Sequence, residues 1–277
     1  MTHHLALRFA ARTDTGKVRG HNEDAIEWSQ EGGVAVLADG MGGYNAGEIA
    51  SNIATTVFRS SLDQSLQEFS WLRRSPGSKQ LERLLTEAVE AANEQILAAS
   101  LSQPEFSGMG TTLVAALFHQ NKVVLAHIGD SRAYRFRQGV LTQLTRDHSQ
   151  LQEQIDAGLV SPEWARFAPN KNLITRALGV AVEIEVETNT YATEAGDIYL
   201  LCSDGLSDML ATEQIVELLG RHADLESTCE DLVNAANDNG GRDNISVILA
   251  RIDALDATPL PGWGERMRVW LKSCMRA

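Results

Sequence analysis

Three short motifs carry most of the chemical information in this 277-residue chain. They are Ala38-Asp39-Gly40-Met41-Gly42-Gly43, Ser203-Asp204-Gly205 and Gly241-Arg242-Asp243-Asn244. Asp39 and Asp204 each follow an apolar run that predicts a buried strand, so both carboxylates leave their strands at the rim of a sheet, where they can converge. Converging carboxylates repel each other, and burying them is costly unless a cation lies between them. The motifs therefore predict a site for a hard divalent cation, which the carbonyls beside the glycines can also approach.

The length and charge of the chain limit the kinds of protein it can be. A chain of 277 residues can bury a sizeable core. We expect one domain, because no linker divides the chain and the motifs of the expected site lie towards both of its ends. The formal net charge of -13 disfavours a nucleic-acid partner, whose phosphates are bound by clustered Lys and Arg.

The cysteines and the apolar segments bear on where the protein works. Cys202, Cys229 and Cys274 have no CxxC spacing, so neither a disulfide framework nor a zinc knuckle is indicated, and a reducing compartment fits best. The N-terminus lacks a basic segment followed by a long apolar one, and no run approaches the roughly 20 apolar residues of a membrane helix. We therefore expect a soluble, cytoplasmic protein without an integral membrane segment.

The apolar periodicity predicts the elements that position the motifs. Strands are expected at 5–12, 32–39, 111–118, 122–128, 132–137, 183–191, 196–203 and 245–252, and helices at 46–58, 80–101, 212–220 and 225–237. Short polar turns between successive strands favour antiparallel pairing. Strand clusters flanked by helix clusters predict an α+β fold in which stacked antiparallel sheets have helices outside. The polar segment at about 146–176 is either a mobile flap or an ordinary helical insertion.

Six motifs in this order mark one family. They are Arg19-Gly20-His21-Asn22-Glu23-Asp24-Ala25, the Asp-Gly-Met-Gly-Gly loop at 39–43, Gly108-Met109-Gly110-Thr111-Thr112, Gly129-Asp130-Ser131-Arg132, Ser203-Asp204-Gly205 and Asp243-Asn244. From about Arg8 to about Asp253 the chain resembles the PPM, or type 2C, metal-dependent serine/threonine protein phosphatases, most of all the short stand-alone bacterial members. The resemblance implies a four-layer αββα sandwich with two Mn²⁺ or Mg²⁺ ions at one rim.

The resemblance also implies roles for the acidic residues. Asp39 matches the carboxylate that bridges both metals, and the Gly40 carbonyl matches the backbone ligand. Asp204 and Asp243 match the carboxylates that complete the first metal. All-oxygen coordination suits Mg²⁺ or Mn²⁺ better than zinc. An isolated Asp before Gly is usually a turn residue, but the joint occurrence of these motifs favours the metal site.

Three further acidic residues match family positions around the two metals. Glu23 and Asp24 match the residues around the second metal, partly through waters. Asp130 matches a position that, in bacterial relatives, helps to hold a third, weaker metal near the flap. The alternative for Asp130 is a turn aspartate that caps the strand before Ser131.

The resemblance implies hydrolysis by a water that bridges the metals and attacks phosphorus in line, without a phosphoenzyme. Arg19 matches the guanidinium that clamps the substrate phosphate, a planar group that Lys cannot replace. Many relatives carry His at the position of Tyr44, where it can protonate the leaving group. Tyr is a poorer acid near pH 7, so metal-bound water or another group is expected to supply the proton. His21 and His148 are candidate substitutes, although a His in a polar loop is more often merely solvated. Cys202 precedes Ser-Asp-Gly and no phosphate loop, so a cysteine phosphatase is not indicated.

The expected function is hydrolysis of phosphoserine and phosphothreonine on proteins, opposing a bacterial serine/threonine kinase. Two other classes are a metal-binding scaffold without catalysis, which only Tyr44 favours, and a two-metal nuclease or phosphodiesterase, which the acidic charge disfavours. We expect a catalytic domain at 1–256 and a C-terminal extension at 257–277. The basic and apolar residues of that extension fit a segment that docks on a partner or membrane surface, a short helix on the domain, or a frayed end.

Overall fold

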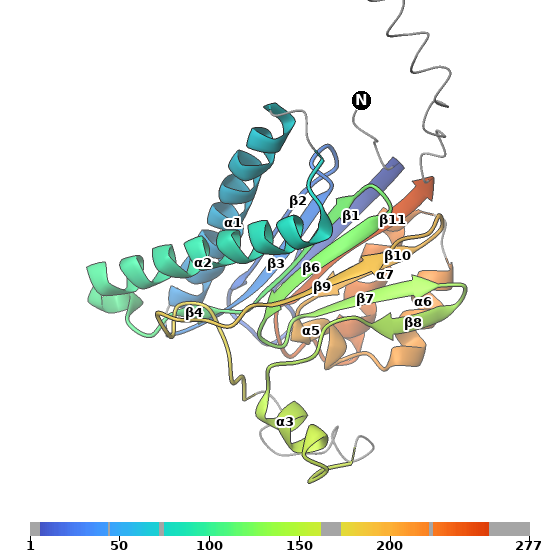
Figure 1. Ribbon diagram of the computed structural model, residues 1–277. Helices are drawn as coiled ribbons and strands as arrows, with labels where there is room; N and C mark the ends of the chain where they lie inside the picture. Colours follow the sequence, from blue (N-terminus) through green and yellow to red (C-terminus); the bar gives the residue numbers. More distant parts are fainter. Residues whose placement is uncertain (1–5, 44, 72–74, 162–172, 222–223, 255–277) are drawn as a thin grey trace, which may run out of the picture.

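The computed structural model describes residues 6–43, 45–71, 75–161, 173–221 and 224–254. In this part of the chain, two antiparallel sheets are stacked and helices cover both outer faces (Figure 1). The arrangement confirms the predicted α+β class and the four-layer αββα sandwich.

The first sheet has the strand order β1-β11-β10-β7-β8. These strands are β1 (Ala6–Asp14), β11 (Ile245–Ala254), β10 (Ile198–Cys202), β7 (Arg132–Arg137) and β8 (Val140–Gln143). The second sheet has the order β2-β3-β5-β6-β9, with β4 paired to β3. Its strands are β2 (Asp24–Ser29), β3 (Val34–Met41), β5 (Leu113–His119), β6 (Lys122–Ile128), β9 (Glu187–Ala192) and β4 (Gly110–Thr111).

Two long helices, α1 (Ala46–Trp71) and α2 (Ser78–Ser102), cover the outer face of the second sheet. The short α5 (Asp204–Ser207) and the helices α6 (Thr212–Arg221) and α7 (Leu225–Asp238) cover the first sheet. The 3-10 turn η1 (Pro104–Phe106) follows α2, and α3 (Gln150–Asp156) projects from one edge of the sandwich (Figure 1).

The strand β3 shows why its sequence is a continuous apolar run. Val34, Val36 and Ala38 pack with the helices α1 and α2, whereas Ala35 and Leu37 pack between the two sheets. Because successive side chains of a strand point to opposite faces, a central strand that is covered on both faces needs apolar residues at every position. The run therefore reaches the rim fully buried and ends in the Asp39 motif.

The sequence predicted most of the elements. The bounds of β6 and β7 are those expected, while the helix predicted at 46–58 extends to Trp71 in α1. The strand predicted at 111–118 is divided into β4 and β5, and β9 begins at Glu187 rather than at 183. The edge strands β2 and β8 were not predicted.

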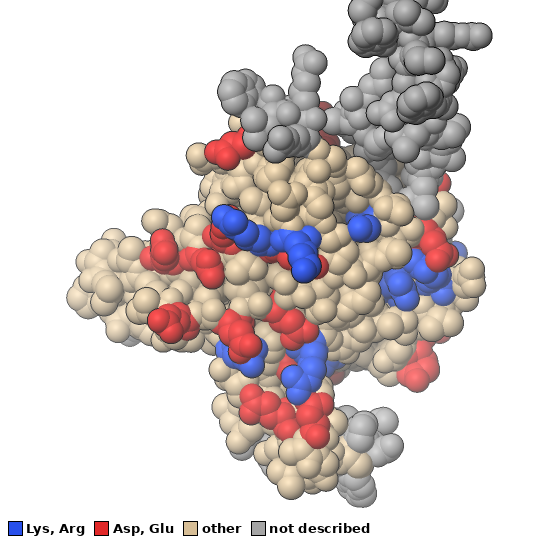
Figure 2. All heavy atoms as spheres, in the orientation of Figure 1, with Lys and Arg blue, Asp and Glu red and all other residues tan. Residues whose placement is uncertain are grey.

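Several sequence expectations lie outside the described residues: Tyr44, residues 162–172 of the expected flap, Cys274 and the C-terminal extension at 257–277. The described beginning of the flap contains the helix α3. None of the helices that the structure describes is long and apolar enough to cross a membrane. Figure 2 shows Lys and Arg in small groups among Asp and Glu on this face, without a broad basic band.

Candidate metal centre

Asp24 and Asp39 lie directly opposite each other on the antiparallel strands β2 and β3. Asp24 is 8% exposed, and its Oδ2 accepts a hydrogen bond of 2.9 Å from the hydroxyl of Ser203. Its other carboxylate oxygen, Oδ1, is buried without a hydrogen-bond partner in the described part of the chain. A buried carboxylate oxygen without a donor is costly, so a cation is the natural group to satisfy it.

The backbone of Asp39 is fixed by the two threonines at the break between β4 and β5. The Asp39 N–H donates to Thr112 Oγ1 at 3.2 Å, and the Asp39 carbonyl accepts from the Thr112 N–H at 2.9 Å. The hydroxyl of Thr111 donates to the same carbonyl at 2.8 Å. The Gly-Met-Gly-Thr-Thr motif therefore holds the Asp39 backbone in place.

Glycines let the aspartate motifs approach one another. A Cβ on Gly205 would lie 1.9 Å from the carbonyl oxygen of Asn244, so only glycine lets the Asp204 motif pack on the Asp243 motif. A Cβ on Gly40 would lie 2.1 Å from the Gly47 carbonyl oxygen. At both positions the two backbones can come this close only because glycine has no side chain.

The carboxylates share one electrostatic environment. Burial raises the pKa of Asp39 well above its ordinary value, and the charges of Asp24, Asp204, Asp130 and Asp243 raise this pKa further. Burial, followed by the charges of Asp130 and other acidic neighbours, also raises the pKa of Asp204 well above its ordinary value. Such mutual repulsion requires the carboxylates to lie close together.

The neighbouring carboxyl groups of Asp24 and Asp130 also have raised pKa values. Burial raises the pKa of Asp24 to about 6, against the hydrogen bonds from Ser246 and Ser203. Burial also raises the pKa of Asp130 to about 6, with a further contribution from the charge of Asp147. A buried, oxygen-only donor set with excess negative charge fits hard divalent cations such as Mg²⁺ and Mn²⁺.

Glu23 lies beside this cluster in the loop before β2. Its side chain is 12% exposed, and its Oε1 lies 3.1 Å from Nε2 of His21. Its backbone N–H donates to Asn244 Oδ1 at 2.8 Å, and its carbonyl accepts from the Gly40 N–H at 3.1 Å. Glu23 is therefore attached to two of the aspartate motifs.

Arg19 lies at the exposed rim of the acidic cluster. Its guanidinium donates to Asp243 Oδ2 at 2.7 Å, and half of the side chain is exposed. The hydrogen bond to Asp243 raises the pKa of Arg19, and the charges of Asp243, Glu23 and Asp39 raise it further. A guanidinium in this position can receive an anionic phosphate at the mouth of the site.

The structure also brings residues to the site that the sequence did not identify. Asp208, one helical turn after Asp204, adds negative charge that raises the pKa values of Asp130 and Asp204. The i, i+4 spacing of two acids beside a site was the available signal. The hydroxyl of Ser203 donates to Asp24 and accepts from the Ser246 N–H, contacts that only the folded structure reveals.

Asn244 and His148 form hydrogen bonds with loops beside the site. The backbone N–H of Asn244 donates to Asp243 Oδ1 at 2.9 Å. The Asn244 side chain instead holds the loop before β2, because Nδ2 donates to the carbonyls of Thr15 and His21. His148, named as an alternative proton donor, is 3% exposed, and its Nδ1 accepts from the Gly129 N–H.

Known proteins share both the sequence and the fold. The family model of protein phosphatase 2C matches residues 17–250. The serine/threonine phosphatase stp of Listeria monocytogenes serotype 4b is 38% identical over 245 residues, which cover 87% of this chain and 94% of the relative. The serine/threonine protein phosphatase PstP of Mycobacterium tuberculosis is 41% identical over 248 residues, which cover 90% of this chain and 45% of PstP.

Solved structures agree with these relatives. The crystal structure of M. tuberculosis PstP/Ppp has a TM-score of 0.81 at 41% identity and covers 90% of this chain and 99% of that one. The structure of Stp1 from Staphylococcus aureus has a TM-score of 0.81 at 34% identity and covers 92% and 98%. A PstP catalytic domain in complex with two manganese ions has a TM-score of 0.77 at 41% identity and covers 88% and 97%. The chain therefore belongs to the protein phosphatase 2C, or PPM, family and is a protein serine/threonine phosphatase.

Proposed function

We propose that this phosphatase acts with two Mn²⁺ or Mg²⁺ ions held by its carboxylate cluster. The observation that carries the proposal is the convergence of Asp39 with Asp24, Asp204 and Asp243, which raises the pKa of Asp39 through burial and like charge. The complex of the PstP catalytic domain with two manganese ions supports the number and the kind of ion.

Within this proposal each acidic residue has a role. Asp39 would help to hold both ions, and the Gly40 carbonyl would be a backbone ligand. Asp204 and Asp243 would complete the first site, while Glu23 and Asp24 would surround the second, partly through waters. Asp130, whose charge acts on both Asp39 and Asp204, helps to hold a third, weaker ion.

The substrate is a phosphoserine or phosphothreonine side chain of a protein. When bound, the ions would supply positive charge for the phosphoryl oxygens and lower the pKa of a water molecule, so that more of it is present as nucleophilic hydroxide at neutral pH. Arg19 orients the phosphate through charge-assisted hydrogen bonds, for which the guanidinium must exchange part of its contact with Asp243. Thr112 and Asn244 hold the backbones of the ligand loops, so that little reorganisation accompanies binding.

Calorimetric titration with Mn²⁺ tests the ligand assignment. Asp39→Ala and Asp204→Ala are expected to abolish high-affinity Mn²⁺ binding and phosphate release while the protein remains folded. Asp63→Ala is the matched control, because Asp63 lies on α1, pairs with Arg59 and is not among the main charges that act on Asp39 and Asp204. A cluster variant with near-native Mn²⁺ binding and turnover would contradict the assignment of that residue.

We also propose that the enzyme works in the cytoplasm, where it opposes a serine/threonine kinase. Cys202 and Cys229 are buried free thiols in the described part of the chain, which supports a reducing compartment. Residues 1–256 form the catalytic domain in this proposal, and truncation after Asp256 is expected to leave the hydrolysis of phosphopeptides intact. A large loss of activity would show that residues 257–277 support the domain.

A further inference from the structure

Two consecutive residues, Asp147 and His148, form hydrogen bonds with the residues that flank Asp130. Gly129, Asp130 and Ser131 connect β6 to β7, and Asp130 is 7% exposed. Asp147 accepts hydrogen bonds from the Arg132 guanidinium at 2.9 and 2.6 Å. His148 binds the residue on the other side of Asp130, namely Gly129.

His148 forms hydrogen bonds with both polar groups of the Gly129 backbone. The His148 N–H donates to the Gly129 carbonyl at 2.9 Å, and the Gly129 N–H donates to Nδ1 of the His148 ring at 3.2 Å. Gly129 has a φ of +106°, and an added Cβ would lie 2.6 Å from Thr112 Cβ. The turn is therefore tight on the Thr112 side and fixed by His148 on the other.

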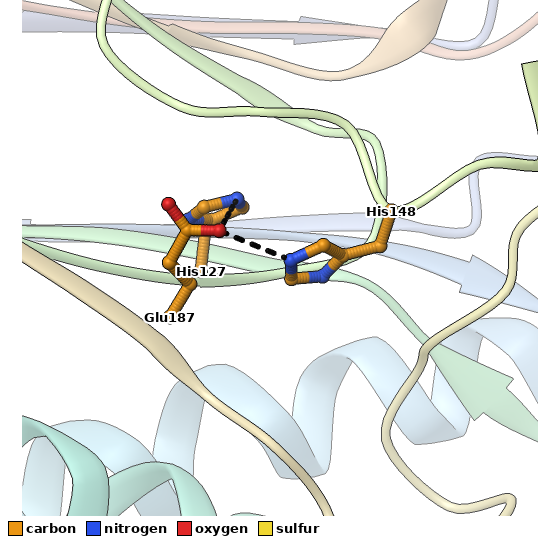
Figure 3. Close-up of side chains that lie close together, drawn as sticks. All are labelled: His127, His148 and Glu187. Atoms are coloured by element: carbon orange, nitrogen blue, oxygen red, sulfur yellow. Dashed lines mark ion pairs between the residues drawn. The ribbon is translucent and has the colours of Figure 1, made fainter. Parts of the chain in front are cut away.

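These contacts define the tautomer of His148. A backbone N–H can only donate, so Nδ1 must carry a lone pair and the proton of the neutral ring lies on Nε2. Nε2 lies 3.5 Å from Glu187 Oε2, with which it forms an ion-pair contact (Figure 3). It has no hydrogen-bond partner in the described residues. Burial lowers the pKa of His148 to about 4, with help from the charges of His127 and Arg176 and against that of Glu187. The ring is thus neutral at pH 7.

His127, His148 and Glu187 also have the composition of a zinc site (Figure 3). Their geometry argues against that role. The two imidazoles are stacked with centroids 4.7 Å apart and planes 16° apart, whereas one ion must lie in the plane of each ring that binds it. His127 Nε2 donates to the Arg146 carbonyl at 2.9 Å, and His148 would have to give up its bond from Gly129, because a ring that binds a metal through Nε2 is protonated at Nδ1.

We propose that His148, in its Nε2–H form, is a positioning residue that holds the Gly129 backbone and so keeps the Asp130 carboxylate directed into the metal centre. His127 supports it by stacking and by fixing the carbonyl of Arg146, two residues before His148. The last step of this inference rests on the proposed role of Asp130 as a metal residue.

Two reciprocal substitutions separate the Nδ1 contact from the rest of the ring. His148→Asn places an acceptor oxygen near the position of Nδ1 and lacks a group at Nε2. His148→Gln can place an amide near Nε2 and has no acceptor at the δ position. Amide hydrogen exchange of Gly129 is measured in the metal-free full chain, and Mn²⁺ binding is measured by calorimetry, with thermal unfolding as the check on folding.

His148→Gln is expected to speed the exchange of the Gly129 amide about tenfold, as loss of one hydrogen bond predicts. It should weaken the Mn²⁺ binding that depends on Asp130 by roughly tenfold, the lower end of the usual effect of residues that support a ligand. His148→Asn is expected to stay close to the wild-type values in both measurements. Equal losses in the two variants, or a larger loss for Asn, would overturn the proposal.

Asp130→Asn separates failure of this inference from failure of the proposed function. Unchanged Mn²⁺ binding in Asp130→Asn would remove the metal role of Asp130, whereas unchanged Gly129 exchange in His148→Gln would remove the role of His148. Titration with Zn²⁺ tests whether Nε2 of His148 carries a proton, as proposed, or binds a metal ion. Stoichiometric Zn²⁺ binding that Glu187→Gln and both His148 variants lose would identify a metal site and overturn the proposal.

Discussion

Asp24 and Asp39 face each other across neighbouring antiparallel strands, β2 and β3. Residues at opposed positions of such a pair have Cβ atoms about 5 Å apart, and two like charges there destabilise the sheet. Asp204 and Asp243 contribute further negative charge to the same place. The fold therefore brings together groups that repel one another, and a bound cation converts this repulsion into binding.

Removal of one of these charges should stabilise the metal-free protein. Asp39→Asn keeps the shape of the side chain and ends its repulsion with Asp24, so the midpoint of thermal unfolding in EDTA should rise, by roughly 2–4 °C for each kcal/mol of relief. Scanning calorimetry with EDTA and with Mn²⁺ measures both states. Mn²⁺ should raise the midpoint of the wild type and leave that of Asp39→Asn unchanged.

Asp63→Asn serves as the control for this pair of measurements, because Asp63 lies on α1 and pairs with Arg59. It should respond to Mn²⁺ as the wild type does. A lower midpoint for metal-free Asp39→Asn would show that the Asp39 carboxylate stabilises the empty site, contrary to this account.

Arg19→Lys should impair turnover and leave the fold intact. Lys keeps the positive charge but cannot give two parallel hydrogen bonds to phosphate, so kcat/KM should fall by roughly 10- to 100-fold. Half of the Arg19 side chain is exposed, so the unfolding midpoint should barely change. Steady-state kinetics on a phosphothreonine peptide gives the result, and a kcat/KM equal to that of the wild type would exclude the bidentate clamp.

A methyl group at Gly205 should damage the metal centre. Its Cβ would lie 1.9 Å from the Asn244 carbonyl oxygen, so Gly205→Ala must separate the Asp204 and Asp243 motifs. We expect a loss of more than about 2 kcal/mol in the free energy of unfolding, together with weaker Mn²⁺ binding.

Gly220→Ala is the matched control for that substitution. Gly220 lies in the helix α6, and the nearest atom to its added Cβ is 3.9 Å away, in Phe136. Because Ala favours the helix over Gly, this change should raise the free energy of unfolding by roughly 0.5–1 kcal/mol. Urea unfolding compares the two variants, and equal effects would rule out the steric explanation.

The stability of the protein should depend on His148 at acid pH. The folded pKa of about 4 lies below the value of roughly 6.5 for an unfolded chain, so the unfolded state binds more protons between these limits. The His148 contribution to stability is therefore complete above about pH 6.5 and falls towards pH 4, by up to about 1.4 kcal/mol per pH unit. The raised pKa values of Asp24 and Asp130 act in the opposite direction in this range, so the contribution of His148 is the difference between the wild type and His148→Asn. Urea unfolding across this range should show a shallower fall for His148→Asn, and the same slope for both proteins would contradict the buried neutral ring.

The success and failure of the strand predictions have physical reasons. The bounds of β6 and β7 could be predicted because short polar turns interrupt clear β patterns. One turn lies between β5 and β6 and contains Gln120 at φ 55°, and the other lies between β7 and β8 and contains Gln138 at φ 50°. The edge strand β2 mixes Asp24 and Glu27 with Ile26 and Trp28, so its pattern alone is weak, and pairing with β3 makes it a strand. β8 has four residues and depends on its pairing with β7.

For the site, the sequence predicted which acids belong together and not what holds them. Asp39, Asp204 and Asp243 sit in short motifs whose types and order are informative by themselves. Thr112 and His148 act through backbone contacts with residues distant in the chain, Asp39 and Gly129. Such contacts arise from tertiary packing, which no local pattern encodes.

Phosphate release from a phosphothreonine peptide tests the central claim most directly. It is measured with Mn²⁺, with Mg²⁺ and with EDTA, for the wild type and for Asp39→Ala. We predict release by the wild type with a divalent ion, none in EDTA, and none by the variant under any condition. Release by the wild type in EDTA, or metal-dependent release by Asp39→Ala at the wild-type rate, would contradict a metal centre built on Asp39.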